Sequence, residues 1–161
     1  MAARCETGWT GSPARRSPRL VLPDTNLLVY AFREDCREHR SACEWLSDVL
    51  DGPAPVALTS AALSGFARVV THPQVFRPPS TIGAALSFLD ALWAAPTAIP
   101  IEPGPRHPKV FAELCRLTGA HGNDVPDAHL AAIAIEAGAE LASHDRGFGR
   151  FPGLRFRDPL D

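Results

Sequence analysis

The sequence of 161 residues lacks the long apolar runs that membrane proteins carry. No stretch reaches the roughly 18 apolar residues that a transmembrane helix needs, so no membrane span is expected. The first residues, 1–19, contain Gly, Ser, Pro and four arginines but no apolar core, which argues against a secretory signal peptide. We interpret residues 1–19 as a disordered N-terminal extension and residues 20–161 as one domain.

Cysteine is scarce and lacks the spacing of a metal site. The four cysteines, Cys5, Cys36, Cys43 and Cys115, form no C-x-x-C pair and have no histidine at zinc-finger spacing. Cys36 and Cys43 fall about two turns apart on one expected helix, which is too far for a disulfide. The cysteines are therefore interpreted as reduced thiols, and the protein as cytoplasmic.

Lysine is almost absent, because Lys109 is the single lysine among 16 basic residues. These residues face 18 acidic ones, and the formal net charge of −2 argues against bulk electrostatic coating of nucleic acid. A local basic surface remains compatible with that charge. Arginine suits two-point contacts with phosphate or carboxylate better than lysine does.

The signature loops of several enzyme classes are also missing. The sequence contains no G-x-G-x-x-G after its first expected strand, no P-loop, no G-x-S-x-G elbow and no H-E-x-x-H pair. These absences argue against dinucleotide-binding enzymes, P-loop nucleotidases, serine hydrolases of the α/β type and zinc proteases. His129 is interpreted as structural, and His144 as an exposed turn residue.

Short apolar runs alternate with amphipathic stretches along the chain. Strands are expected at residues 20–22, 56–58, 98–101 and 141–143, with a weak fifth near 154–156. Helices are expected at residues 27–32, 35–50, 60–70, 81–93, 110–118 and 124–137. Such alternation predicts an α/β fold with a central parallel sheet and helices on both faces.

Three aspartates stand where ligands bind in such sheets. Asp24 and Asp145 each follow a strand directly, and Asp127 lies in the first turn of the helix before the last confident strand. Singly, each could start a helix, stabilise a helix N-terminus or form a turn. Together, converging carboxylates need a divalent cation, and with Asn26 and Ser143 nearby they suggest Mg²⁺, with Mn²⁺ as an alternative.

Three segments resemble the motifs of PIN domains in their order and spacing. They are Val21-Leu-Pro-Asp24-Thr-Asn26, Gly122-Asn-Asp-Val-Pro-Asp127 and Ser143-His-Asp145-Arg-Gly-Phe148. The segments from Gly65 to Phe76 and from Glu102 to His107 are similar to a VapC-type subgroup.

The resemblance implies a three-layer α/β/α sandwich and a Mg²⁺-dependent endoribonuclease that cuts structured RNA such as tRNA or rRNA. It also implies the toxin role in a type II toxin–antitoxin pair, a VapB-type antitoxin partner and a homodimer. By motif, Asp24 and Asp127 would be the main metal ligands. Asp145 would complete the cluster directly or through a water, and Asn26 would orient Asp24 or a water.

Two glycines depart from the family pattern. Gly65 stands where many members have a glutamate, and Gly147 stands where many have a second closing acid. Fewer carboxylates predict one metal rather than two, and Asp124, interpreted mainly as a helix cap, could supply some of the missing charge. The departures leave open an alternative, a catalytically degenerate PIN module that binds antitoxin or RNA without cleavage.

A dehalogenase-like phosphatase is a remote third reading, because such enzymes need a second Asp where this chain has Asn26. RNA contacts would have to come from individual arginines near the motifs. The best candidates are Arg68, Arg146 and Arg150, followed by Arg33, Arg77 and Arg106.

Overall fold

The computed structural model describes residues 19–161. Most of the expected extension, residues 1–18, lies outside the described residues, so that prediction stays untested. The sheet has five parallel strands in the order β3-β2-β1-β4-β5. The strands are β1 (Val21–Pro23), β2 (Val56–Leu58), β3 (Ala98–Pro100), β4 (Glu140–Ala142) and β5 (Arg155–Arg157).

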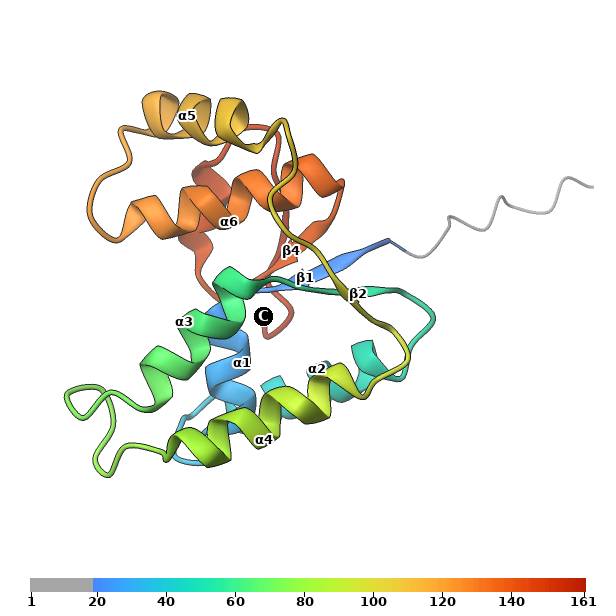
Figure 1. Ribbon diagram of the computed structural model, residues 1–161, viewed down its shortest axis with the longest axis vertical. Helices are drawn as coiled ribbons and strands as arrows, with labels where there is room; N and C mark the ends of the chain where they lie inside the picture. Colours follow the sequence, from blue (N-terminus) through green and yellow to red (C-terminus); the bar gives the residue numbers. More distant parts are fainter. Residues whose placement is uncertain (1–18) are drawn as a thin grey trace, which may run out of the picture.

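Helices cover both faces of this sheet (Figure 1). They are α1 (Thr25–Phe32), α2 (His39–Leu50), α3 (Ser60–Val70), α4 (Ile82–Trp93), α5 (His107–Thr118) and α6 (Asp124–Ala137), with a short 3-10 helix, η1 (Arg146–Arg150). Figure 1 shows α5 and α6 on one side of the sheet and α1, α2 and α4 on the other. The expected three-layer α/β/α arrangement is confirmed.

The alternation of side chains along β2 separates two hydrophobic cores. Val56 and Leu58 point into the core that α1 to α4 build, whereas Ala57 packs into the core of α5 and α6. Side chains of a strand alternate between the two faces, so a strand buried on both sides is apolar throughout. All three β2 residues are buried, as this requires.

The strand order places a topological switch point between β1 and β4. The chain runs from β1 to β2 and β3 on one side, and later returns to form β4 and β5 on the other side of β1. In open parallel sheets, the crevice at the carboxyl ends of two such strands is where ligands bind. Asp24 and Ser143 are the residues that directly follow β1 and β4.

Several expected boundaries are wrong by a few residues. The helix expected from residue 35 begins at His39, because residues 34–38 form turns, so Cys36 does not share a helix with Cys43. The helix expected from residue 27 begins at Thr25, and Asp24 occupies its N-cap position, although the Asp24 side chain makes no capping hydrogen bond. The carboxylate therefore remains available to other partners.

The helix that carries Asp127 also differs from expectation at its start. Asn123 stands at the N-cap position and Asp124 is the first helical residue, so the capping role expected for Asp124 is wrong. Glycines end α5 and α6, since Gly119 and Gly138 at their C-caps have φ values of 66° and 67°. None of the helices in residues 19–161 is both long and apolar enough to span a membrane.

Candidate active site

Asp24 is held at the carboxyl end of β1 and is only 5% exposed. Its backbone N–H donates to the carbonyl of Ala142 at 2.9 Å, which joins the end of β1 to the end of β4. Burial raises the pKa of the Asp24 carboxyl, while the hydrogen bond from Ser143 and the adjacent backbone of Thr25 and Asn26 partly offset that rise. The Ser143 hydroxyl thus offsets only part of the cost of ionising this buried carboxyl.

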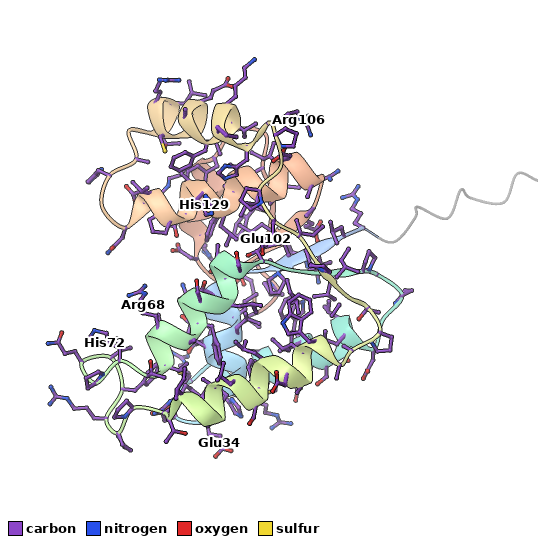
Figure 2. The ribbon with its side chains drawn as sticks, viewed as in Figure 1. Glu34, Arg68, His72, Glu102, Arg106 and His129 are labelled. Atoms are coloured by element: carbon purple, nitrogen blue, oxygen red, sulfur yellow. The ribbon has the colours of Figure 1, made fainter. Side chains whose placement is uncertain are left out.

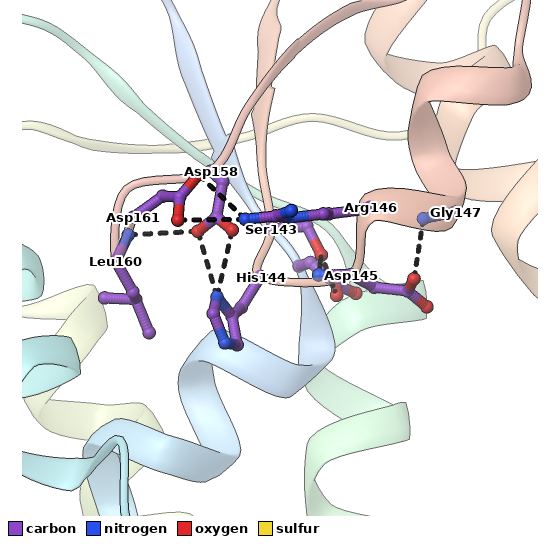
Figure 3. A network of polar contacts seen from close by, with 9 residues as sticks. Ser143, His144, Asp145, Arg146, Gly147, Asp158, Leu160 and Asp161 are labelled. Atoms are coloured by element: carbon purple, nitrogen blue, oxygen red, sulfur yellow. Dashed lines mark hydrogen bonds and ion pairs between the residues drawn. The ribbon is translucent and has the colours of Figure 1, made fainter.

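Ser143 connects two of the predicted acids. Its hydroxyl donates to Asp24 Oδ2 at 2.7 Å and accepts the backbone N–H of Asp145 at 3.0 Å (Figure 3). Asp145 in turn occupies the N-cap position of η1, where its carboxylate accepts the N–H of Gly147 at 2.8 Å. The fully buried Ser143 therefore fixes the start of the Asp145 loop relative to Asp24. The sequence indicated a polar neighbour here but not this bridging role.

Asp127 lies in the first turn of α6 and is half-buried. Its pKa is raised from 3.8 to about 6, first by burial and then by the negative charges of Asp24 and Asp145. Arg150 opposes the rise. The charges of Asp24 and Asp145 therefore act on the Asp127 carboxyl.

A cavity of about 240 Å³ opens beside these acids. Its walls come from the β1–α1 junction, α3 and the start of α6. They are formed by Asp24, Thr25, Asn26, Ala61, Ala62, Gly65, Arg68, Val69, Asn123, Pro126, Asp127, His129 and Leu130. Asp24, Asn26 and Asp127 thus share one cavity, whereas Asp145 lies outside its lining and is tied to it through Ser143.

The two glycines that depart from the family pattern have different surroundings. At Gly65, a Cβ atom would stand 2.9 Å from Thr25 Oγ1, so the Thr25 hydroxyl fills the space that any larger residue would take. At Gly147, a Cβ atom would stand 2.9 Å from Asp145 Oδ1. Gly147 therefore permits the close approach through which its own N–H binds the Asp145 carboxylate.

His129 lines the cavity two residues after Asp127, a placement that its interpretation as structural missed. Burial, and then the neighbouring His107, lower the pKa of His129. The two rings meet edge to face, with centroids 4.6 Å apart. Since a lowered pKa favours the neutral ring, His129 adds a polar but uncharged group to the cavity wall.

The candidate RNA-binding arginines differ in their partners. Arg68 projects from α3 and lines the cavity (Figure 2). Arg146 is paired with Asp161 at 2.9 Å, and Arg150 is paired with Asp124 at 3.0 Å and with Asp127 at 3.2 Å. Arg33 binds Asp35 and Arg106 binds Glu136. Of the three leading candidates, Arg68 is the one for which residues 19–161 contain no ion pair.

The segment from Glu102 to His107 has a structural role in this fold. The Glu102 carboxylate accepts both the N–H and the hydroxyl of Ser60 at the start of α3. The carboxylate of Glu136 on α6 accepts the N–H groups of Gly104 and Arg106, both at 2.8 Å. Figure 2 shows Glu102 close to the start of α3. This segment therefore braces two helices that carry cavity residues.

His144 is more constrained than an exposed turn residue. Its Nδ1 lies 3.0 Å from both carboxylate oxygens of Asp158 (Figure 3). Arg146 reaches Asp161 in the same view. The C-terminal residues thus hold side chains on either side of Asp145, which steadies the loop that presents this acid.

The structure thus brings a buried aspartate, Asp24, and a half-buried one, Asp127, to the switch point of a parallel α/β sheet, and comparison with known proteins identifies the class of this fold. Residues 21–154 match the PIN domain family. The chain is 46% identical to ribonuclease VapC43 of Mycobacterium tuberculosis over 88% of its own length and 97% of the relative. It is 36% identical to ribonuclease VapC31 of the same species, over 88% and 100%. The chain therefore belongs to the VapC group of the PIN domain family.

Solved structures agree on the fold. The chain resembles a chain of the Rickettsia felis VapBC2 complex bound to a promoter DNA fragment, with a TM-score of 0.64 and 21% identity, covering 86% of this chain and 97% of that one. It also resembles Mycobacterium tuberculosis VapC20, a toxin that cleaves the sarcin-ricin loop, with a TM-score of 0.59 and 16% identity, over 84% and 98%. At these identities the likeness supports the fold alone.

Proposed function

We propose that this protein is a Mg²⁺-dependent endoribonuclease that cuts structured RNA such as tRNA or rRNA, and that it acts as the toxin of a toxin–antitoxin pair. The observation that carries the proposal is that Asp24 and Asp127 line the same cavity. The chain's relatives at 46% and 36% identity are named as ribonucleases, which supports the same activity. A VapB-type antitoxin and a homodimer are the partners we expect.

The chemistry of the donor set fits a divalent cation. Within residues 19–161, no group of three or more His, Cys, Asp and Glu side chains forms a ready-made metal site. Magnesium, however, is usually bound through one or two carboxylates, with waters and substrate phosphates completing its shell. Burial is the largest cause of the raised pKa of Asp127, and the negative charges of Asp24 and Asp145 add to it while Arg150 opposes it, so a cation at this site would meet carboxylates that repel one another.

The residues would divide the work by position. Asp24 and Asp127 would hold the cation, and Asp145 would add negative charge beside them. Ser143 would keep the Asp24 carboxylate oriented, and Asn26, at the wall of the same cavity, would orient Asp24 or a water. When bound, Mg²⁺ or Mn²⁺ would supply stabilisation of the charge that develops on the phosphate during cleavage.

RNA would reach the cavity past Arg68, whose charge can meet a phosphate. Arg146 and Arg150 remain candidates, but each would first have to leave the carboxylates that bind it. We therefore expect Arg68→Ala to weaken RNA binding more than Arg146→Ala does.

Cleavage of total cellular RNA by the purified protein tests the proposal. Wild type should cut RNA with added Mg²⁺ or Mn²⁺, lose activity in EDTA and regain it when metal returns. Asp24→Asn should abolish cleavage and growth inhibition while its circular dichroism stays that of wild type. Asp90→Asn is the matched control, because Asp90 is exposed on α4, and it should cut like wild type.

The outcomes separate the two readings of this fold. Full activity of Asp24→Asn with bound metal would overturn the site assignment. A wild-type protein that binds RNA or antitoxin but never cuts, whichever metal is added, would favour the degenerate module that Gly65 and Gly147 suggested. Mapping the new RNA ends after controlled expression would identify the target.

A further inference from the structure

Arg150 occupies the acidic side of the candidate site. One of its terminal nitrogens, Nη2, lies 3.0 Å from Asp124 Oδ1 and 3.2 Å from Asp127 Oδ2. The guanidinium carbon also lies 4.9 Å from the centre of the Phe151 ring. The side chain of Arg150 is 36% exposed, so the pair is partly solvated. Three contacts from two elements thus fix an arginine against two carboxylates of α6.

The other arginines do not share this position. Arg146, on the same 3-10 helix, pairs with Asp161 at 2.9 Å, away from α6. Arg68 lines the cavity from α3 and makes no ion pair within the described residues. In residues 19–161, Arg150 is therefore the arginine that neutralises a predicted metal ligand directly.

We infer that Arg150 is an internal counter-cation that competes with the divalent metal for Asp127 and so sets the metal concentration at which the site loads. This inference rests on the proposed function for the identity of the metal ligands. Arg150 and a divalent cation are both attracted to the Asp127 carboxylate, and they repel each other once both are close. Each therefore weakens the binding of the other.

The contacts of Arg150 indicate what happens when metal arrives. Arg150 holds Asp127 through a single nitrogen, without the two-point geometry that makes arginine–carboxylate pairs strong. The contacts to Asp124 and Phe151 do not involve Asp127. Arg150 can therefore give up Asp127 and stay anchored on Asp124.

Mn²⁺ binding to the RNA-free protein, followed by isothermal titration calorimetry and by the loss of the free-Mn²⁺ electron paramagnetic resonance signal, tests the inference. Arg150→Gln should bind Mn²⁺ about tenfold more tightly, since one unit charge no longer opposes a divalent cation in a partly solvated site. Arg150→Lys keeps the charge and should stay close to wild type. Arg146→Gln removes the same charge from the same helix and should change the affinity by less than about twofold.

Unchanged or weaker Mn²⁺ binding by Arg150→Gln would overturn the inference, as would an equal gain in Arg146→Gln. The proposed function fails in a different way. If neither wild type nor Arg150→Gln binds Mn²⁺, the aspartates are not a metal site at all. If wild type binds Mn²⁺ and Arg150→Gln binds it no better, the metal site stands and the role of Arg150 is wrong.

Discussion

Replacement of Asp127 by asparagine should stabilise the fold while it removes the proposed metal ligand. The pKa of Asp127 rises from 3.8 to about 6 on folding, because burial and the charges of Asp24 and Asp145 disfavour its ionised form. A carboxyl with a raised pKa lowers stability at every pH above its folded pKa. The uncharged amide of asparagine escapes that penalty.

The magnitude follows from the size of the rise. A change from 3.8 to about 6 corresponds to about 3 kcal/mol before any correction. The side chain is 32% exposed, and solvent screening reduces the penalty to about 1.5 kcal/mol. Removing a negative charge from the first turn of α6 then costs about 0.5 kcal/mol. We expect a net gain of about 1 kcal/mol in the free energy of unfolding.

Urea denaturation in EDTA, followed by circular dichroism at several pH values, measures this gain. It should be full at about pH 7.5, shrink as pH falls below about 6, and vanish below about pH 3, where Asp127 is protonated in both folded and unfolded states. Asp124→Asn is the control one turn earlier on α6, and it should lower stability by roughly 0.5 kcal/mol through the helix dipole. A destabilised Asp127→Asn, or a gain that does not change with pH, would refute the reasoning.

Three further changes have clear expected outcomes. Ser143→Ala removes a buried hydroxyl that serves two partners and should cost about 2–3 kcal/mol in urea denaturation, whereas Ser64→Ala, at an exposed helical site, should cost less than about 0.5. Equal losses would contradict the bridging role. Gly104→Ala would set a Cβ 2.6 Å from Glu136 Oε1 and should lower the free energy of unfolding by about 2 kcal/mol. A melting temperature close to that of wild type would contradict this expectation. Gly83→Ala has open space within α4 and should raise stability by roughly 0.5–1 kcal/mol in the same assay.

The helices were predictable where local chemistry alone decides them. Gly119 and Gly138 end α5 and α6 because glycine adopts positive φ values without strain. Thr59 and Thr81 begin α3 and α4 by accepting backbone N–H groups three residues ahead. The start of α2 was missed, because the helical spacing of apolar residues continues through a region that folds as turns.

The site was predictable only in part. That Asp24 and Asp145 follow strands is visible along the chain, since apolar runs end just before them. That Asp124 pairs with Arg150 rather than capping α6 is not visible, because the two residues are 26 positions apart and only the packing of η1 near α6 brings them together. The position of His129 at the cavity wall is also not visible along the chain, because the helical pattern alone does not show which residues face a cavity.

By itself, then, the sequence determined the class of this protein: an alternating α/β chain with acids at strand ends, in the order and spacing of PIN-domain motifs. Those features are visible along the chain, because they depend on the spacing of apolar residues, on turn residues and on the order of the motifs. The tertiary structure decided which charges meet. It joined Asp24 to Ser143 across 119 residues and left Arg150 against Asp127. Such contacts depend on strand order and helix packing, because strand order and helix packing bring distant residues together. The contacts in turn determine the charges that a bound metal would meet.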